Sequence, residues 1–228
     1  MQKPWFLRQV MLSLILMLAV ALTSTNASAA ASSHYDQGRL FAEANATLDE
    51  LLTGGDPADH IRNALSQAHG LLIFTDSGAE TGSEGWQGLL FGRDAGGSWT
   101  GPAVFSVTSG SFGPPPTDRV GRVMLIALTA VERLIAERIR LGGSGLSVAR
   151  LGPGPLPQAD IVAVTTAAEA NEDPQQTFAG TVLAPDQYAT NVLYGEPITI
   201  REAVASTADI GDDVVNLRRR LDAESGAP

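Results

Sequence analysis

Ester hydrolysis by a serine nucleophile would require a serine held on a tight turn between glycines. The esterase elbow has a glycine two residues before the serine and another two residues after it. Ser144 follows Gly142 by two residues, but Leu146 stands two residues after it, and no other serine meets both conditions. The elbow is therefore absent. A hydrolase would need an unrecognised site, for which Ser111 and Ser144 are the serines to substitute.

Two glycine clusters invite comparison with phosphate-binding loops. The run GRDAGG covers residues 92–97, and the run GGSG covers residues 142–145. Neither has the glycine spacing of a Walker or dinucleotide-binding loop, and neither leads into a predicted helix. Both clusters therefore predict turns between strands.

Metal-binding and acid-base groups are sparse. The histidines His34, His60 and His69 lie in or before the predicted N-terminal helices, and the chain has no cysteine. Thiolate metal sites, disulfides and a cysteine nucleophile are thus excluded, and we expect neither a metal nor a cofactor. Adjacent carboxylates such as Asp212 and Asp213 lie in hydrophilic sequence and need no role beyond solvation. A glycosidase pair stays open, although the sequence does not single one out.

The glycine-rich middle of the chain is unusual in its aromatic residues. We interpret Phe91 and Phe105 as core residues of strands, since aromatic side chains commonly fill half-buried strand positions. Trp99 and Phe112 stand beside glycine and serine at predicted loop edges, where an exposed ring could line an apolar groove. Phe178 follows in a later strand-like run. These rings are the candidates for contact with an apolar ligand.

Two helices are predicted at the start of the mature chain. Apolar residues recur at helical spacing over residues 35–52, and a glycine pair then ends the segment. Asp56 and Pro57 form an N-cap and first-turn pair for a second helix, which should run to Ala68.

The rest of the sequence is mainly typical of short strands. Apolar runs separated by glycine, proline, aspartate and serine predict strands at 71–74, 88–92, 103–110, 122–129, 146–149, 161–166 and 177–183. One helix interrupts them at 130–139, and short helices are expected at 185–194 and 199–205. The predicted fold class is α+β, with two N-terminal helices, a largely antiparallel sheet or partial barrel with an inserted helix, and short C-terminal helices. Residues 207–228 are expected to form an exposed helix with a frayed tail.

The first 29 residues have the pattern of an export signal. Lys3 and Arg8 precede the uninterrupted run VMLSLILMLAVAL at 10–22, and small residues follow at 27–29. A membrane-spanning helix needs roughly 20 apolar residues, so cleavage is favoured over a retained anchor. We expect residues 30–206 to form one domain in a periplasmic or secreted protein.

The charge of the chain limits its partners. The net charge is −10, and removal of residues 1–29 leaves 13 arginines against 25 acidic residues, a charge of −12. Such an excess argues against binding to nucleic acid or to a strongly anionic membrane surface. An anionic ligand would therefore need a local basic patch.

Five segments, in order, resemble the blocks of the SYLF-domain family. They are AHGLLIF at 68–74, GLLFGRDAGGSWTGPAVFSVTSGSFG at 88–113, TD at 117–118 before RVMLIALT, TFAGTVL at 177–183 and DQYATNVLYG at 186–195. The resemblance covers roughly residues 68–204. The sequence departs from the family pattern in a shorter hairpin after the first block and in the run PPPTDRVGR at 114–122.

This resemblance implies a lipid-binding domain. Eukaryotic members of the family bind phosphoinositides and some also bind actin, whereas bacterial members are exported proteins. Their lipid-binding helix is basic, but the helix expected here carries Asp36, Glu43, Asp49 and Glu50 against Arg39.

The resulting hypothesis is a lipid-binding module without catalytic activity that holds a phospholipid or an acyl chain. The acyl chain would lie against a groove rimmed by Trp99, Phe105, Phe112 and Phe178, at about 0.8 kcal/mol per buried methylene. Arg93, Arg119 and Arg122 would meet the headgroup phosphate, or else be solvated turn and strand-edge residues. One alternative is an envelope scaffold that binds another protein through its acidic surface and C-terminal helix. The other is the hydrolase considered above.

Overall fold

The fold was obtained as a computed structural model that describes residues 37–53, 55–75, 86–108, 122–166, 178 and 180–226. Contacts divide the chain into two units, Met1–Gly38 and Arg39–Pro228, and the account below concerns the second. The predicted signal segment, residues 1–29, lies outside the described residues.

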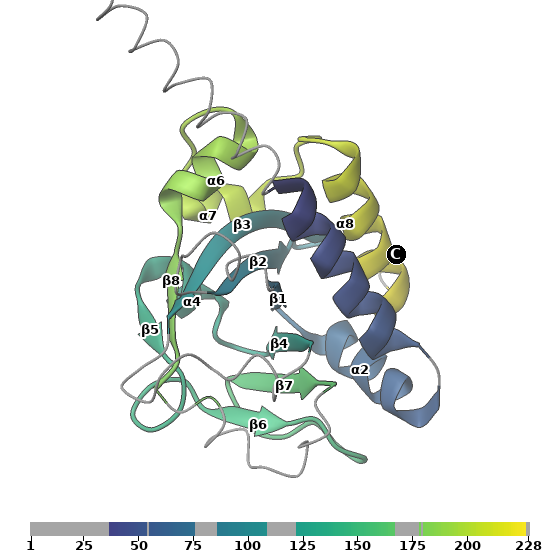
Figure 1. The fold of residues 1–228 in the computed structure, drawn as a ribbon. Coiled ribbons are helices and arrows are strands. Elements are labelled where there is room, and N and C mark those ends of the chain that lie inside the picture. The colour runs from purple at the N-terminus through teal and green to yellow at the C-terminus, as the bar shows by residue number, and fades with distance from the viewer. Residues whose placement is uncertain are drawn as a thin grey trace, which may run out of the picture. The chain divides into compact units, whose positions relative to one another are not determined.

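The described elements are helices first, then runs of short strands interrupted by one helix, and helices again at the end (Figure 1). A first helix ends at residue 52. It is followed in chain order by α2 (Gly55–Gln67), β1 (Gly70–Thr75), β2 (Trp86–Arg93), β3 (Trp99–Thr108), β4 (Val123–Ala127), α4 (Val131–Ala136), β5 (Ile139–Arg140), β6 (Val148–Arg150), β7 (Ile161–Thr165), β8 (Val182–Pro185), α6 (Gln187–Tyr194), α7 (Ile200–Ala205) and α8 (Asp212–Ser225).

Eight strands form one curled sheet in the order β5-β8-β3-β2-β1-β4-β7-β6. The named strand pairs are antiparallel except β6 with β7, which is parallel. Leu72 at the centre stands opposite Leu90 on one side and Leu125 on the other. The prediction of an α+β fold with a largely antiparallel sheet, preceded and followed by helices, is therefore confirmed.

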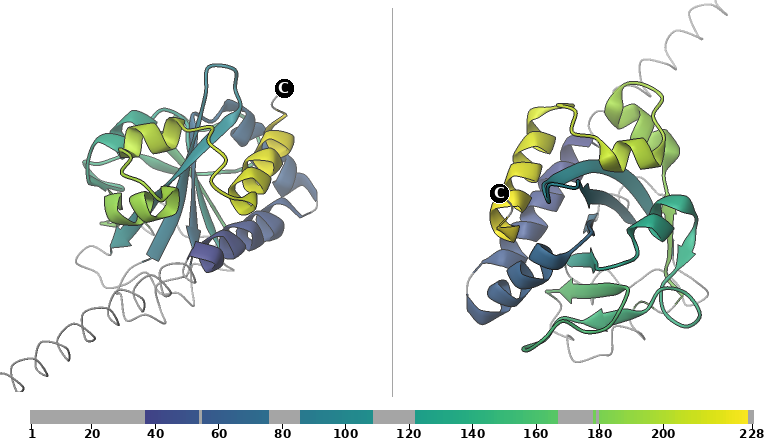
Figure 2. Two further views of the ribbon diagram at one scale, coloured as in Figure 1. Left: turned by 90° about the horizontal axis from the view of Figure 1, so that it is seen from above. Right: turned by 180° about the vertical axis from the view of Figure 1, so that it is seen from behind.

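The two faces of the sheet are both apolar, because successive strand residues point to opposite faces. Leu71 and Ile73 belong to an outer core, into which the first helix, α2 and α8 pack. Leu72 and Phe74 belong to an inner core on the concave face, which α4 and α7 complete. The two views in Figure 2 show the three outer helices together on one side of the sheet.

One end of the curled sheet is closed by α4 and α7, and glycine makes this close approach possible. A Cβ atom added at Gly92 would lie 2.6 Å from Cγ1 of Val204 in α7. A Cβ atom at Gly70 would lie 2.5 Å from Cγ2 of Val131 in α4. Side chains at these strand positions would push the two helices away from the sheet.

At the opposite end of the sheet lie the strand ends that flank three long connections. Thr75 pairs with Gln87 one residue into β2, Thr108 pairs with Val182, and Val123 pairs with Thr165. Connections 76–85, 109–121 and 167–177 therefore begin and end at this edge, which we call the open rim. The three connections themselves lie outside the described residues.

Both glycine clusters form turns, as predicted. In the first, Asp94 accepts hydrogen bonds at Oδ1 from the backbone N–H groups of Gly96 and Ser98. In the second, the backbone N–H of Gly145 donates to the oxygen of Gly142, and an isolated bridge joins Leu141 to Leu146.

The inserted helix is shorter than predicted. It ends at Ala136, and Ile139, expected as its last residue, instead begins β5 and pairs with Leu183 of β8. Ile139 is buried in the inner core, so pairing across the sheet overrides the local helical spacing.

The predicted exposure of the C-terminal helix is wrong. Val214, Leu217 and Leu221 repeat on one face of α8 and are buried in the outer core. Arg218 is also buried and donates hydrogen bonds to the backbone oxygens of Ser206 and Ala208. The helix is thus part of the packed structure.

Candidate functional site

Trp99 is a core residue and does not line a surface groove. Its side chain is 2% exposed, and its ring N–H donates to Oγ of Ser225 at 3.0 Å. Its backbone N–H donates to Oδ1 of Asp222 at 2.8 Å. Both acceptors come from α8, which covers the ring that the sequence placed at an exposed loop edge.

Arg93 lies over the same ring and not in free solvent. Its guanidinium carbon is 4.6 Å from the centroid of the Trp99 ring, within the range of a cation–π contact. Its Nε and Nη2 atoms are buried and make no hydrogen bond to the described residues. Burial lowers the pKa of Arg93, while the charges of Asp222 and Asp94 act in the opposite direction. Arg93, the last residue of β2, therefore stacks on Trp99, the first residue of β3.

The sequence predicts a groove rimmed by Trp99, Phe105, Phe112 and Phe178. The three of these rings that the structure describes do not form it. Phe105 and Phe178, 0% and 4% exposed, belong to the inner core, whereas Trp99 belongs to the outer core. The sheet itself separates the two cores, since Val104 next to Phe105 points to the outer one. Phe112 lies outside the described residues, as does Arg119.

Arg122 is held by acidic residues of the first helix. Its Nη1 atom lies 3.1 Å from Oε2 of Glu43, and its Nε atom lies 3.6 Å from Oε2 of Glu50. Its backbone N–H donates to Oγ1 of Thr166 at 2.9 Å. The acidic residues of this helix therefore neutralise the cation that the sequence suggested for a headgroup, which does not favour that role.

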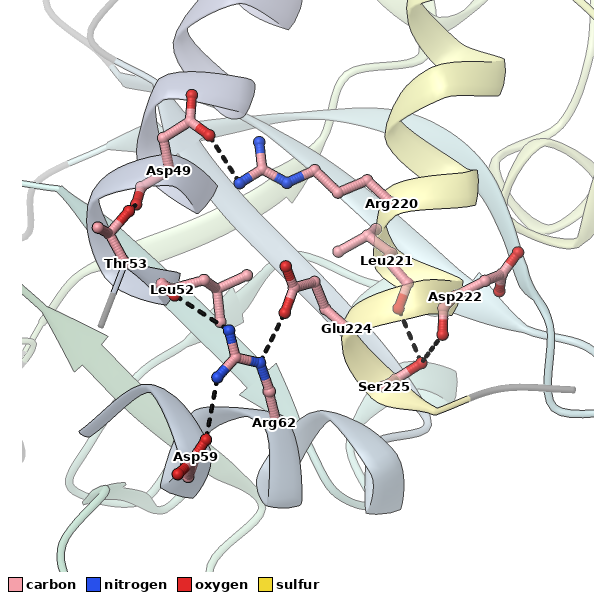
Figure 3. Close-up of polar contacts among 10 residues, drawn as sticks. All are labelled: Asp49, Leu52, Thr53, Asp59, Arg62, Arg220, Leu221, Asp222, Glu224 and Ser225. Carbon is pink, nitrogen blue, oxygen red and sulfur yellow. Dashed lines mark hydrogen bonds and ion pairs between the residues drawn. The ribbon is translucent and has the colours of Figure 1, made fainter. Parts of the chain in front are cut away.

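Ion pairs between the outer helices were not predicted from the sequence (Figure 3). Arg62 of α2 contacts Glu224 of α8 at 2.7 Å and donates to the backbone oxygen of Leu52 at 3.1 Å. Arg220 of α8 lies 2.8 Å from Asp49 of the first helix. These partners are far apart in sequence, so local spacing gave no signal for them.

Among the described residues, Asp160, Ser147 and Thr129 form a polar cluster. Oδ2 of Asp160 accepts hydrogen bonds from the backbone N–H and the hydroxyl of Ser147, at 2.9 and 2.7 Å. The hydroxyl of Thr129 donates to Oδ1 of the same carboxylate at 3.2 Å. The cluster contains no histidine, and it fixes the start of β6 to the start of β7.

Ser144 is exposed in the turn before β6, and Ser111 lies outside the described residues. Among the described residues, no group of three histidines or carboxylates is placed to hold a metal ion.

We expect Asp160→Ala to lower the free energy of unfolding by about 1–2 kcal/mol at neutral pH, because it removes hydrogen bonds to a charged acceptor. The hydrogen bonds from Ser147 lower the pKa of Asp160 below its ordinary value of 3.8. A carboxyl group whose pKa is lowered by folding stabilises the fold above its unfolded pKa, and this is lost as the pH falls through the folded pKa. The difference between wild type and variant should therefore shrink below about pH 4. Urea unfolding across this range tests the expectation, with Asp160→Asn as a variant that cannot titrate. A difference that stays constant with pH would contradict it.

Within the described ranges, no helix is long and apolar enough to cross a membrane. No protein-family model, no curated protein and no solved structure matches this chain.

Proposed function

We propose that this protein is an exported lipid-binding module that holds a phospholipid or an acyl chain without changing it chemically. The observation that carries the proposal is the placement of the described parts of the blocks that resemble the SYLF-domain family, with the TD block at 117–118 outside the described residues. They contribute β1, the β2–β3 hairpin, β4 and the β8–α6 segment, and their strands are consecutive in the sheet, in the order β8-β3-β2-β1-β4. Blocks spread over more than half of the chain thus form one continuous structural unit, as expected if they serve one function.

The open rim is the proposed place of contact. The opposite end of the sheet is closed by α4 and α7, and Trp99, Phe105 and Phe178 are committed to the cores. Of the residues suggested by the sequence, Phe112 and Arg119 belong to connection 109–121, which joins β3 to β4 at the open rim. We assign the apolar contact to Phe112 and the headgroup contact to Arg119.

The test begins with the lipid content of the purified protein. Mass spectrometry of extracted lipids should find a phospholipid or fatty acid in stoichiometric amount, or the protein should float with phosphatidylcholine vesicles. Phe112→Ser should weaken vesicle binding about tenfold or more, since burial of a phenylalanine side chain is worth about 1.5–3 kcal/mol.

Tyr188→Ser is the matched control, because Tyr188 is 76% exposed on α6 and also loses an aromatic ring. Its effect on lipid binding should be small. If no lipid co-purifies and no vesicle binds, the lipid-binding proposal fails, and a scaffold that binds another protein becomes the better hypothesis.

A further inference from the structure

The carbonyl oxygens at the end of α7 are bound by residues of β3 and α8. The hydroxyl of Thr100 in β3 donates to the oxygen of Val204 at 2.6 Å. The oxygen of Ser206, the C-cap residue of α7, accepts from the backbone N–H of Gly101 at 2.8 Å and from Nη1 of Arg218 at 3.2 Å. The last carbonyl groups of a helix have no partner inside that helix, so these contacts from other elements satisfy them.

Arg218 connects the two faces of the sheet. The apolar residues Ile200, Ala203 and Val204 of α7 lie in the inner core, whereas the apolar residues of α8 lie in the outer core. Figure 2 shows α7 and α8 on opposite sides of the sheet. Through Nη2, Arg218 of α8 also donates to the oxygen of Ala208, in the connection between the two helices, at 2.8 Å. Arg218 therefore holds both the end of α7 and the following connection against α8.

The environment of Arg218 is unusual for a cation. The residue is buried, and within the described part of the chain its guanidinium group makes no ion pair. Arg62 and Arg220, in contrast, pair with carboxylates of neighbouring outer helices. Burial of a charge is costly unless hydrogen bonds compensate for it. The described hydrogen bonds of Arg218 go to two backbone oxygens, so its burial depends on the position of the α7–α8 connection.

The helix α7 covers one end of the inner core as a lid. Its residue Ala203 is fully buried, and Val204 lies close against β2. On its exposed side, α7 is joined to α4 by the ion pair of Arg201 with Glu132 at 2.7 Å. These two side chains are 62% and 73% exposed, and an ion pair in that environment stabilises little. The position of the lid therefore depends more on the contacts at its carboxyl end.

We infer that Arg218 couples the two helices, so that α7 keeps its place over the inner core only while α8 is docked on the outer face. Displacement of α8 would withdraw the guanidinium group from Ser206 and Ala208, and α7 would then open locally. A molecule that binds the outer helices and moves α8 would in this way expose the inner core at the closed end of the sheet. The inference goes beyond the proposed function, because it holds whether or not the protein binds lipid.

A buried arginine can also have a purely structural role. In that case its removal lowers the stability of the whole fold, and protected amide hydrogens in all parts of the sheet exchange faster by a similar factor. Coupling predicts instead a local effect at the end of α7. Hydrogen exchange measured by NMR at single residues separates the two, because local and global opening affect different sets of amides.

The main test compares Arg218→Met with the wild type. Methionine keeps an unbranched side chain but donates no hydrogen bond. The amide hydrogens of Gly101 and Ser206 should exchange about tenfold to 100-fold faster, the usual effect of losing a hydrogen bond to a charged group. The reference is the amide of Ile161, which donates to Ser147 and lies in β7, separated from β3 by β2, β1 and β4. Its exchange should stay close to that of the wild type.

A second experiment tests whether α8 acts on α7 through Arg218. Val214 of α8 is buried in the outer core, so Val214→Ala weakens the packing of this helix without touching the α7–α8 connection. With Arg218 present, the change should accelerate exchange at Ser206 severalfold more than at Ile161. In the Arg218→Met background, where the link is already broken, Val214→Ala should accelerate exchange at Ser206 by less than about twofold.

Arg219→Gln is the matched control, because Arg219 is the exposed neighbour of Arg218 and donates to Asn216 on its own helix. It should leave exchange at Gly101 and Ser206 unchanged. Arg218→Lys keeps the charge but loses the planar fork that reaches two oxygens, so its exchange should fall between the wild type and Arg218→Met. Urea unfolding shows whether each variant folds. If the methionine variant does not fold, the lysine variant and the single α8 variant decide the matter.

Three results would overturn the inference. Unchanged exchange at Gly101 and Ser206 in a folded Arg218→Met protein shows that α7 does not depend on this arginine. Equal acceleration at Ser206 and Ile161 shows that the role of Arg218 is global. An equal effect of Val214→Ala in both backgrounds shows that α8 acts on α7 without Arg218. Each of these results leaves the lipid-binding proposal untouched, since that proposal is tested by vesicle binding.

Discussion

Phe105→Ala is expected to lower the free energy of unfolding by about 3–5 kcal/mol, the usual loss for a buried phenylalanine. The ring is fully buried in the inner core. Phe105 stands opposite Gly88 on β2 and Pro185 on β8, so the neighbouring side chains offer little to fill the cavity. At about 2–4 °C per kcal/mol for a domain of this size, the melting temperature should fall by roughly 6–20 °C. Urea unfolding followed by circular dichroism measures the effect.

Tyr188→Ala provides the control for Phe105→Ala. Tyr188 is an aromatic residue that is mostly exposed, so its removal should change stability by about 0.5 kcal/mol or less. The expected pattern is a large loss of stability for Phe105→Ala and almost none for Tyr188→Ala. A stable Phe105→Ala protein that has lost lipid binding would instead support the groove inferred from the sequence, with Phe105 as a ligand contact.

The sheet could be predicted from the sequence because its signals are local. Short apolar runs bounded by glycine, proline, aspartate and serine mark β1, β2, β3, β4 and β7 within a few residues of their ends. Short connections between successive strands favour antiparallel neighbours, and the turn at Asp94 joins β2 to β3 in this way. The fold class therefore followed from residue pattern alone.

The burial of Trp99 could not be predicted in the same way. Its neighbours Gly97 and Ser98 are typical of a loop edge, and they do lie in the turn that precedes β3. The ring is covered by α8, whose Asp222 lies 123 residues further along the chain. Tertiary contacts over such separations leave no trace in local spacing, which explains why a core residue was interpreted as a surface one.

The environments of the arginines of α8 could not be predicted from local sequence either. The run Arg218-Arg219-Arg220 was interpreted as part of an exposed helix, but the three side chains have different environments. Arg218 is buried and holds the segment before α8, Arg219 contacts Asn216 on its own helix, and Arg220 pairs with Asp49. A run of like charges thus does not by itself indicate a solvated face.

These corrections change where a ligand contact is expected. With three of the four rings inside the protein and Arg122 paired to the first helix, the residues inferred from the sequence no longer define one groove. The feature that remains for a ligand contact is the open rim. The lipid hypothesis therefore depends on Phe112 and Arg119.

Leu217→Ala is expected to lower the free energy of unfolding by about 2–5 kcal/mol, because Leu217 is fully buried between α8 and the sheet. An exposed tail helix would show almost no change. The loss should be cooperative, since α8 is tied to α2 by the 2.7 Å contact of Glu224 with Arg62 and to β3 through Trp99. In a Trp5→Phe/Trp86→Phe background, Trp99 fluorescence reports on the α8 contact, and its unfolding curve should coincide with that of circular dichroism.

The control for Leu217→Ala is Asn216→Ala, which changes the adjacent, exposed position of the same helix. It removes a hydrogen-bond acceptor of Arg219 and should cost about 0.5 kcal/mol or less. If Leu217→Ala and Asn216→Ala are equally mild, or if Trp99 fluorescence changes well before the sheet unfolds, α8 is a separable tail. If Leu217→Ala alone is severe and both probes agree, the C-terminal helix completes the core that supports the open rim, and its removal should abolish any function located there.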